Sequence, residues 1–359
     1  MKKWTILLLL FPAITFGQYQ SGFLSEHFFG RQPSARAEAM GKGYVSIDGD
    51  LASTFYNPAG ISSINGLELN GSLASPYYLL TKAKYNLISV GYKIKDYLVI
   101  GLSRNHFTWG EKINFTDING NTISSYTPYN SNYCLTLSSQ PIKNLFLGLN
   151  TNYFVWQPGV MDKAATSIYF DFGAIKKFQF LQRKTSGQSI NIGASITNFN
   201  YAKVTLKYLA NISKNNLPVI TRYGANYQFT LDKHLLIDTL KTLRLLLQGE
   251  YQILLNSQYN SALRAGCELQ LLEILSFRAG YYKEKVYDYG IPSANYNEIS
   301  AFTYGLGIQL PLYKLTKIPL TMNFDYTSLP QVSYTKTTTD WGNFTTYNFR
   351  INWILKNKN

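Results

Sequence analysis

The sequence lacks any apolar run long enough to cross a membrane as a helix. A spanning helix needs about 20 predominantly apolar residues, and the best candidate, residues 4–16, has 13 and contains Pro12. Lys2 and Lys3 precede this run and small residues follow it, which is typical of a secretory signal peptide. We therefore predict a signal peptide over residues 1–17, cut near Gly17, and a mature chain that begins at Gln18.

Cysteine and histidine are also scarce. The two cysteines, Cys134 and Cys267, provide no disulfide framework. The three histidines, His27, His106 and His234, show neither a metal-binding spacing nor a partner serine motif. We therefore expect no catalytic residues, no metal site and no cofactor, and the chain is not predicted to be an enzyme.

Charged residues make up only 15% of the chain, and bases outnumber acids, giving a formal net charge of +14. A basic balance is compatible with nucleic-acid binding, but the sequence has no helix dense in Lys and Arg. We expect no nucleic-acid partner, and instead an anionic membrane surface or anionic solutes.

What the chain has in abundance is alternation of apolar and polar residues, together with 29 Tyr and 21 Phe. In the last such segment, Tyr347, Phe349, Ile351 and Trp353 alternate with polar residues. Most segments run 10 to 13 residues, which matches the length of about 9–11 that a tilted membrane-spanning strand needs. Fourteen candidate strands are predicted: 66–75, 84–94, 97–106, 131–139, 145–156, 166–177, 188–199, 217–229, 242–254, 261–270, 274–283, 299–310, 318–327 and 344–354.

The predicted connections alternate between short and long. Residues 95–96, 140–144 and 271–273 form tight turns, whereas 107–130 and 200–216 form long loops, although 178–187 is long for a turn. Short turns on one rim and long loops on the other are typical of bacterial outer-membrane barrels, which have an even number of strands. The predicted fold class is all-β, a 14-stranded antiparallel transmembrane β-barrel.

Charged residues share the polar face of the predicted strands. Because a charge on the lipid face is costly, we expect them to point into the lumen. There they bind a solute, pin a plug, or form salt bridges that only fill the interior. The predicted polar network consists of Arg222, Arg244, Glu250, Arg264, Glu268, Arg278, Asp325 and Arg350.

The segment before the first strand differs from the rest. Ser34 is a suitable N-cap for a short helix rich in alanine, and Gly41 interrupts that helix. Asn57 is biased toward an extended conformation by Pro58. Gly60 permits a turn that a Cβ would block.

These residues carry a family resemblance. "ARAEAMGKGYVSIDGDLASTFYNPAGIS" closely resembles the N-terminal motif of FadL-type outer-membrane proteins and their PorV-like relatives, and weaker matches extend the resemblance over residues 34 to 354. The resemblance implies an N-terminal arm and hatch over 18–65 inside a barrel over 66–354, followed by a tail over 355–359. The hatch residues it implies are Ala35, Ala37, Met40, Gly41, Asn57, Pro58 and Gly60.

The resemblance implies two functions. One is passage of hydrophobic or amphipathic solutes across the outer membrane of a Gram-negative bacterium, with outer-membrane lipid and hydrophobic small molecules as partners. The alternative is a PorV-like, non-transporting component of type IX secretion in Bacteroidota, which binds secretion-system proteins or secreted cargo through its outer loops. A barrel of no specific activity is a third hypothesis.

Overall fold

A computed structural model describes residues 28–30, 33–75, 82–95, 97–157, 164–208, 211–232, 239–255, 261–287, 296–330 and 343–354. The expected signal peptide, the expected tail, His27 and His234 lie outside these residues.

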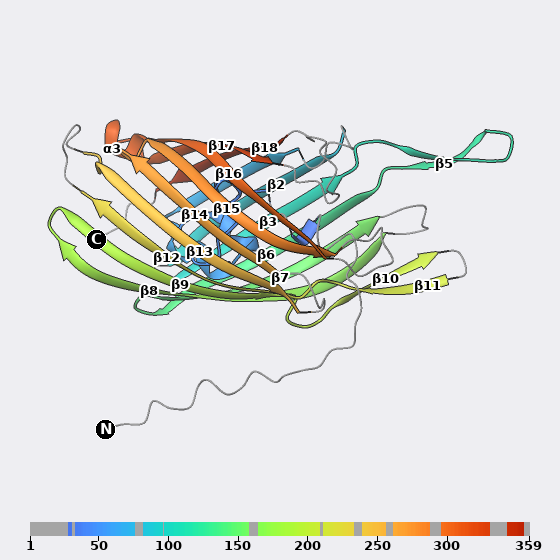
Figure 1. Ribbon diagram of the computed structural model, residues 1–359, viewed down its shortest axis with the longest axis horizontal. Coiled ribbons are helices and arrows are strands. Elements are labelled where there is room, and N and C mark those ends of the chain that lie inside the picture. The colour runs from blue at the N-terminus through green and yellow to red at the C-terminus, as the bar shows by residue number, and fades with distance from the viewer. Residues whose placement is uncertain are drawn as a thin grey trace, which may run out of the picture.

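Fourteen of the described strands form a closed barrel in which every neighbouring pair is antiparallel, which confirms the predicted architecture (Figure 1). Apart from β18, which closes the barrel against β1, and the insertions described below, neighbours in the barrel follow one another along the chain. The barrel strands are β1 Leu67–Ala74, β2 Lys84–Lys95, β3 Leu98–Thr108, β6 Tyr129–Ile142, β7 Leu145–Gln157, β8 Ala165–Arg183, β9 Ser186–Thr197, β12 Ile220–Leu231, β13 Leu243–Leu254, β14 Ser261–Leu271, β15 Leu275–Tyr287, β16 Tyr296–Pro311, β17 Leu320–Pro330 and β18 Asn343–Trp353.

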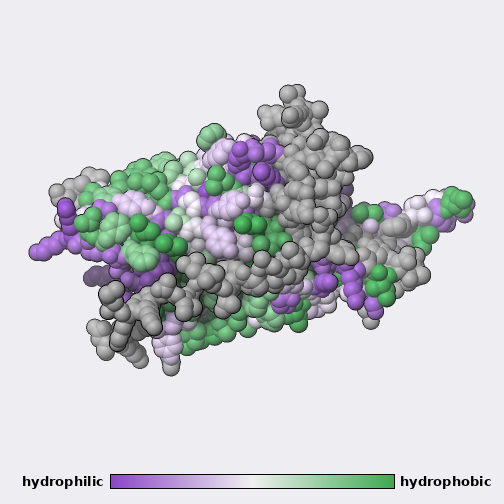
Figure 2. Space-filling model, turned by 60° about the horizontal axis from the view of Figure 1, so that its bottom comes forward, coloured by the Kyte–Doolittle hydropathy of each residue, from purple (hydrophilic) through white to green (hydrophobic). Residues whose placement is uncertain are grey.

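Side chains alternate between the two faces of the wall, as the period of two requires. In β7, Leu149 and Tyr153 are exposed on the outer face, while Asn150 and Asn152 are fully buried on the inner face. Figure 2 shows apolar side chains gathered along the barrel wall. The outer face is therefore apolar and much of the inner face is polar, the reverse of a water-soluble barrel.

The two ends of the barrel differ. At the short-turn end, β8 and β9 are joined by residues 184–185, because β8 continues to Arg183 where the sequence suggested a longer turn. The short helix α3 (Leu312–Leu315) lies at the same end. At the long-loop end, two hairpins project beyond the barrel: β4 (Ile113–Thr116) with β5 (Thr122–Tyr126), and β10 (Lys203–Tyr208) with β11 (Asn211–Asn216). The sequence predicted these two segments as loops.

Within residues 33–66 three short helices precede β1: α2 (Ala35–Ala39) and the 3-10 helices η2 (Leu51–Phe55) and η3 (Pro58–Ser63). None of the helices in the described part of the chain is long and apolar enough to cross a membrane.

Candidate functional site

Residues 33–64, called the inner segment below, pack against the inner face of the wall. Helix α2 contacts β15 to β18, η2 contacts β1 and β2, and η3 contacts β3 and β6 to β8. Ser34 caps α2, since its hydroxyl accepts a hydrogen bond from the Ala37 N–H at 3.3 Å. The inner segment therefore touches the wall on several sides, and Figure 1 shows its helices within the ring of strands.

The Asn57-Pro58-Ala59-Gly60 element makes hydrogen bonds both within the inner segment and to the wall. The Asn57 amide nitrogen donates to the carbonyls of Val45 at 2.7 Å, Ala174 at 3.1 Å and Ala194 at 3.3 Å. Its amide oxygen accepts from the Ala59 N–H at 3.0 Å and caps η3. One buried side chain thus joins the inner segment to β8 and β9.

Wall glycines allow the inner segment to approach closely. A Cβ on Gly173 would lie 2.0 Å from the Asn57 Oδ1, and one on Gly148 would lie 2.2 Å from the Pro58 carbonyl carbon. Glycines in eight strands would each bring a Cβ within 3.0 Å of the inner segment: Gly91, Gly148, Gly173, Gly193, Gly224, Gly266, Gly280 and Gly305. Glycine at these wall positions therefore lets the inner segment pack directly against the backbone of the strands.

Gly41 on the inner segment fits the wall in the same way. Its backbone φ is +71°, a value that residues with a side chain rarely adopt. A Cβ at this position would also lie 2.5 Å from the carbonyl oxygens of Ala265 and Tyr281. Next to it, the Met40 carbonyl accepts from Gln248 at 2.9 Å. Ala35 and Ala37 are fully buried, and Pro58 and Gly60 are buried as well.

A first ion-pair cluster joins α2 to the wall. Arg36 donates to both carboxylate oxygens of Glu268 at 2.7 Å. Arg278 donates to Glu268 at 2.6 Å and to Asp325 at 2.7 Å. All four side chains are at least nine-tenths buried.

Asp50 extends this cluster to Arg350 on β18, the last strand of the barrel. It accepts from Arg36 at 3.1 Å and from the Tyr44 hydroxyl, and it lies 3.3 Å from an Arg350 nitrogen. Burial favours the neutral form of Asp50, but the charges of Arg350 and Arg36 and the Tyr44 hydroxyl hold the pKa of Asp50 below its usual range. Asp50 is therefore a buried carboxylate that depends on these partners for its charge.

A second cluster centres on Glu250. One carboxylate oxygen accepts from the backbone N–H groups of Tyr44 at 2.6 Å and Val45 at 2.8 Å, and the other from Arg264 at 3.0 Å. Arg222 lies 3.9 Å from Glu250. Arg264 also donates to Glu284 at 3.2 Å, and Glu284 accepts from Lys42 of the inner segment at 3.1 Å.

Seven of the eight side chains in the predicted network thus meet a carboxylate or an arginine, and Arg244 does not. Arg244 donates to Gln228 at 3.2 Å, its Nε has no hydrogen-bond partner, and no carboxylate among the described residues lies within ion-pair distance. It borders a polar cavity of about 220 Å³ at the short-turn end. The cavity lining includes Gln228, Lys241, Arg244, Gln270 and Gln309.

Sequence reasoning missed the half of the network that the inner segment supplies. Arg36, Lys42, Tyr44 and Asp50 are not among the residues predicted for the network. A signal was present, because a charged Arg36 within a short alanine-rich helix needs a buried partner.

The interior at the long-loop end is apolar instead. Tyr85, Phe107, Phe154 and Tyr169 form an aromatic basin on the inner face. The basin also includes Val204, Leu206, Leu217, Ile220 and Leu254, with Trp109 and Trp156 packed against it.

Phe28 and Phe29 fill this basin and are almost fully buried. The Phe28 ring lies 5.6 Å from that of Phe154, and the Phe29 ring lies 5.7 Å from that of Tyr169. The Tyr85 hydroxyl donates to the Phe28 carbonyl at 2.8 Å. Two apolar side chains from the N-terminal arm thus occupy an apolar site inside the barrel.

The described residues contain no cluster of three His, Cys, Asp or Glu side chains that could hold a metal ion. His106 lies on the outer face of β3, where its Nδ1 is 2.6 Å from the Ser131 hydroxyl.

No protein-family model matches the chain, and no curated protein matches it. Among solved structures, the chain is similar to the toluene transporter TodX of Pseudomonas putida, with 11% identity, 89% of this chain and 96% of that chain covered, and a TM-score of 0.41. It is similar to a FadL homologue of Pseudomonas aeruginosa, with 11% identity, 90% and 98% covered, and a TM-score of 0.42. For the toluene transporter TbuX of Ralstonia pickettii the identity is 10%, the coverage 89% and 96%, and the TM-score 0.36. These TM-scores lie below 0.5, so the barrel architecture rests on this chain's own strand pairing.

Proposed function

We propose that this protein is an outer-membrane barrel that passes hydrophobic or amphipathic solutes through its lumen, with the inner segment as a movable hatch. The closed ring of strands supports a membrane location, because a closed barrel leaves no strand edge unpaired in lipid. The apolar outer face and buried polar interior support the same location.

The aromatic basin is the observation that carries the proposal. Small-molecule sites are concave, mostly apolar and rich in aromatic side chains, and this one already holds Phe28 and Phe29. We propose that a solute entering from the long-loop end takes the place of these two rings. The exchange replaces one set of apolar contacts by another, so it needs little free energy.

Beyond the basin, the solute meets the inner segment and then the cavity beside Arg244. The ion pairs on Arg36 and Glu250 must open or shift for the inner segment to move. Arg244, which lacks a carboxylate partner, is suited to receive the acidic group of an amphipathic solute on the far side.

Binding of dodecanoate to the purified barrel tests the proposal, with the fluorescence of Trp109 and Trp156 beside the basin as the readout. Replacing Phe28 and Phe29 by alanine removes the competing side chains, so dodecanoate should bind more tightly. Phe302→Ala is the matched control, because Phe302 is 76% exposed on the outer face. Unchanged or weaker binding by the double variant would count against the basin as the solute site.

One observation favours the PorV-like alternative. The two projecting hairpins expose Ile118, Ile123 and Ile212, which are 101%, 71% and 68% accessible. Exposed apolar side chains on a projecting hairpin suit contact with a protein partner. If hairpin variants lose a crosslinked secreted protein while the barrel binds no dodecanoate, the secretion role replaces the transport role.

A further inference from the structure

Arg104 lies on the outer face of the wall, where an arginine is not expected. Its neighbours on β3 show the direction: Ser103 and Asn105 are buried on the inner face, and Leu102 is 55% exposed on the outer face. An outward arginine costs free energy near the membrane midplane and little near the interface. Arg104 therefore needs either a location near the interface or an anionic partner.

The surroundings of Arg104 provide a cationic site without an acid. Its guanidinium carbon lies 5.8 Å from the centre of the Tyr133 ring, and its Nε is buried with no hydrogen-bond partner. Among the described residues, no carboxylate lies within ion-pair distance of it. Lys84, exposed on β2, lies toward the long-loop end on the same side of the barrel.

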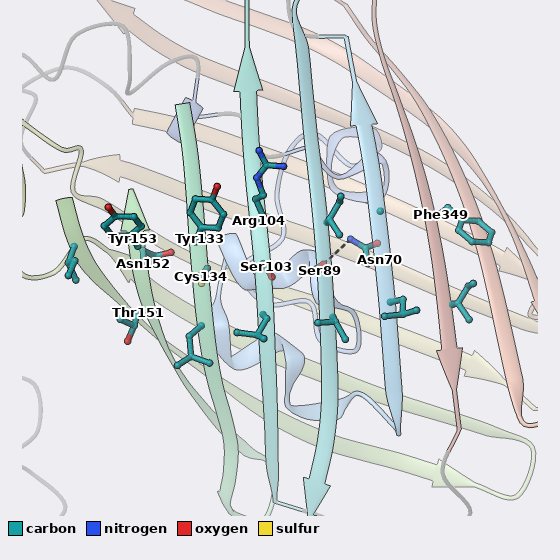
Figure 3. Close-up of a pocket in the computed structure, with 18 residues that line it drawn as sticks. Asn70, Ser89, Ser103, Arg104, Tyr133, Cys134, Thr151, Asn152, Tyr153 and Phe349 are labelled. Carbon is teal, nitrogen blue, oxygen red and sulfur yellow. Dashed lines mark hydrogen bonds between the residues drawn. The ribbon is translucent and has the colours of Figure 1, made fainter. Parts of the chain in front are cut away.

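Towards the short-turn end from Arg104, the outer wall is hollowed into a depression of about 860 Å³ (Figure 3). The figure shows Arg104 and Tyr133 side by side on neighbouring strands. Apolar side chains of Leu69, Ile88, Leu102 and Leu135 contribute to the lining. Gly71 helps to keep the depression open, since a Cβ there would meet nothing within 4 Å.

We propose that this depression binds one phosphorylated glycolipid of the surrounding leaflet, with its acyl chains in the hollow and a phosphate on Arg104 and Lys84. The inference rests on the membrane location given under the proposed function. The charge arrangement favours a phosphate, because a guanidinium can donate two parallel hydrogen bonds to phosphate oxygens.

The position of Arg104 along β3 indicates which leaflet of the membrane it faces. Arg104 lies four residues before the end of β3 at the long-loop end, which faces outward in outer-membrane barrels. The outward-facing leaflet of such membranes is built of phosphorylated glycolipid. Lipid that merely surrounds the barrel would show no dependence on a single arginine.

Native mass spectrometry of the detergent-purified barrel tests the inference. The probes are diphosphoryl lipid A, its dephosphorylated form, and phosphatidylglycerol. We expect one diphosphoryl lipid A per barrel, retained about tenfold more strongly by the wild type than by Arg104→Gln, as the loss of a charge-assisted contact implies. Arg104→Lys should retain part of the binding, because it keeps the charge without the planar donor pair.

Filling the depression gives a second, independent test. Gly71→Leu places a side chain in open space and should reduce retention without affecting folding. Gly249→Leu is its matched control, because Gly249 is also free of neighbours within 4 Å and lies on β13, away from the depression. Lys283→Gln is the control for charge, since Lys283 already pairs with Glu298 at 2.6 Å.

Equal retention of phosphorylated and dephosphorylated lipid A, equal retention of phosphatidylglycerol, or no effect of Arg104→Gln and Gly71→Leu would overturn the inference. Such a result leaves the solute proposal standing, because dodecanoate binding is measured inside the barrel. Conversely, a barrel that binds lipid A but no dodecanoate supports this site and refutes the proposed transport.

Discussion

Arg36 of α2 donates two parallel hydrogen bonds to Glu268 of β14, from Nε to Oε2 and from Nη2 to Oε1, each at 2.7 Å. This buried fork joins the inner segment to the wall. Bidentate pairs of this kind are stronger and more directional than single hydrogen bonds. The pair holds the inner segment in one position, yet it consists of contacts that a change in charge can break.

Breaking this pair should loosen the inner segment. Arg36→Met leaves Glu268 with fewer partners, and removing one member of a buried pair costs about 3–5 kcal/mol. Limited proteolysis of the folded barrel should show faster cleavage within residues 33–64.

The matched control is Lys283→Met, which breaks the exposed pair of Lys283 with Glu298. Exposed pairs contribute about 0–1 kcal/mol, so its proteolysis should match the wild type. Equal effects of the two substitutions would show that the buried fork does not hold the inner segment.

Gly173→Ala should displace the Asn57 element. The added Cβ would lie 2.0 Å from the Asn57 Oδ1, so the inner segment or β8 has to shift. We expect a higher single-channel conductance in planar bilayers. Gly249→Ala, at an open position on the outer face, should conduct like the wild type. A Gly173→Ala barrel with unchanged conductance would mean that the lumen closes by other contacts.

Asn57→Asp should be more disruptive than Asn57→Ala. The amide nitrogen donates to three carbonyl oxygens, and a carboxylate would direct negative charge at them. A buried acceptor left unsatisfied costs about 1–3 kcal/mol, and more when charge is involved. We expect the unfolding temperature, followed by electrophoretic mobility, to be highest for the wild type, lower for Asn57→Ala and lowest for Asn57→Asp. The opposite order of the two variants would contradict this role of the side chain.

Acid should release the inner segment through Asp50. Because its folded pKa lies below its usual range, Asp50 stabilises the folded state above its unfolded pKa of about 3.9. That contribution is lost as the pH falls through the folded pKa. Conductance should therefore rise in this acidic range. Asp50→Asn should show higher conductance at neutral pH and a smaller rise with acid, whereas an identical acid response would assign the effect to other groups.

The alternation of apolar and polar residues was sufficient to predict the barrel, because a wall with lipid on one side and polar groups on the other repeats every two residues. It also led to the expectation that Glu250, Arg264 and Glu268 point inward, and all three side chains are buried in the structure. It did not predict their partners, because Arg36 and Lys42 lie far away in the sequence and are brought near only when the barrel closes around the inner segment. The sequence did not predict the hairpin β4–β5, because its strands have only four and five residues, too few for the alternation to stand out. The sequence did not predict an outward-facing Arg104, because the rule that charges face inward leaves no place for an arginine on the outer face.

A disulfide between the inner segment and the wall gives the most direct test of the central claim that solutes pass by moving the inner segment. The hydroxyl oxygens of Ser62 and Ser138 lie 2.5 Å apart, so cysteines at both positions should be close enough to bond. In a background without Cys134 and Cys267, uptake of dodecanoate into proteoliposomes is measured with the pair oxidised and then reduced. We expect the oxidised barrel to block uptake and the reduced barrel to restore it. Equal uptake in both states, or uptake in neither, would contradict a movable hatch.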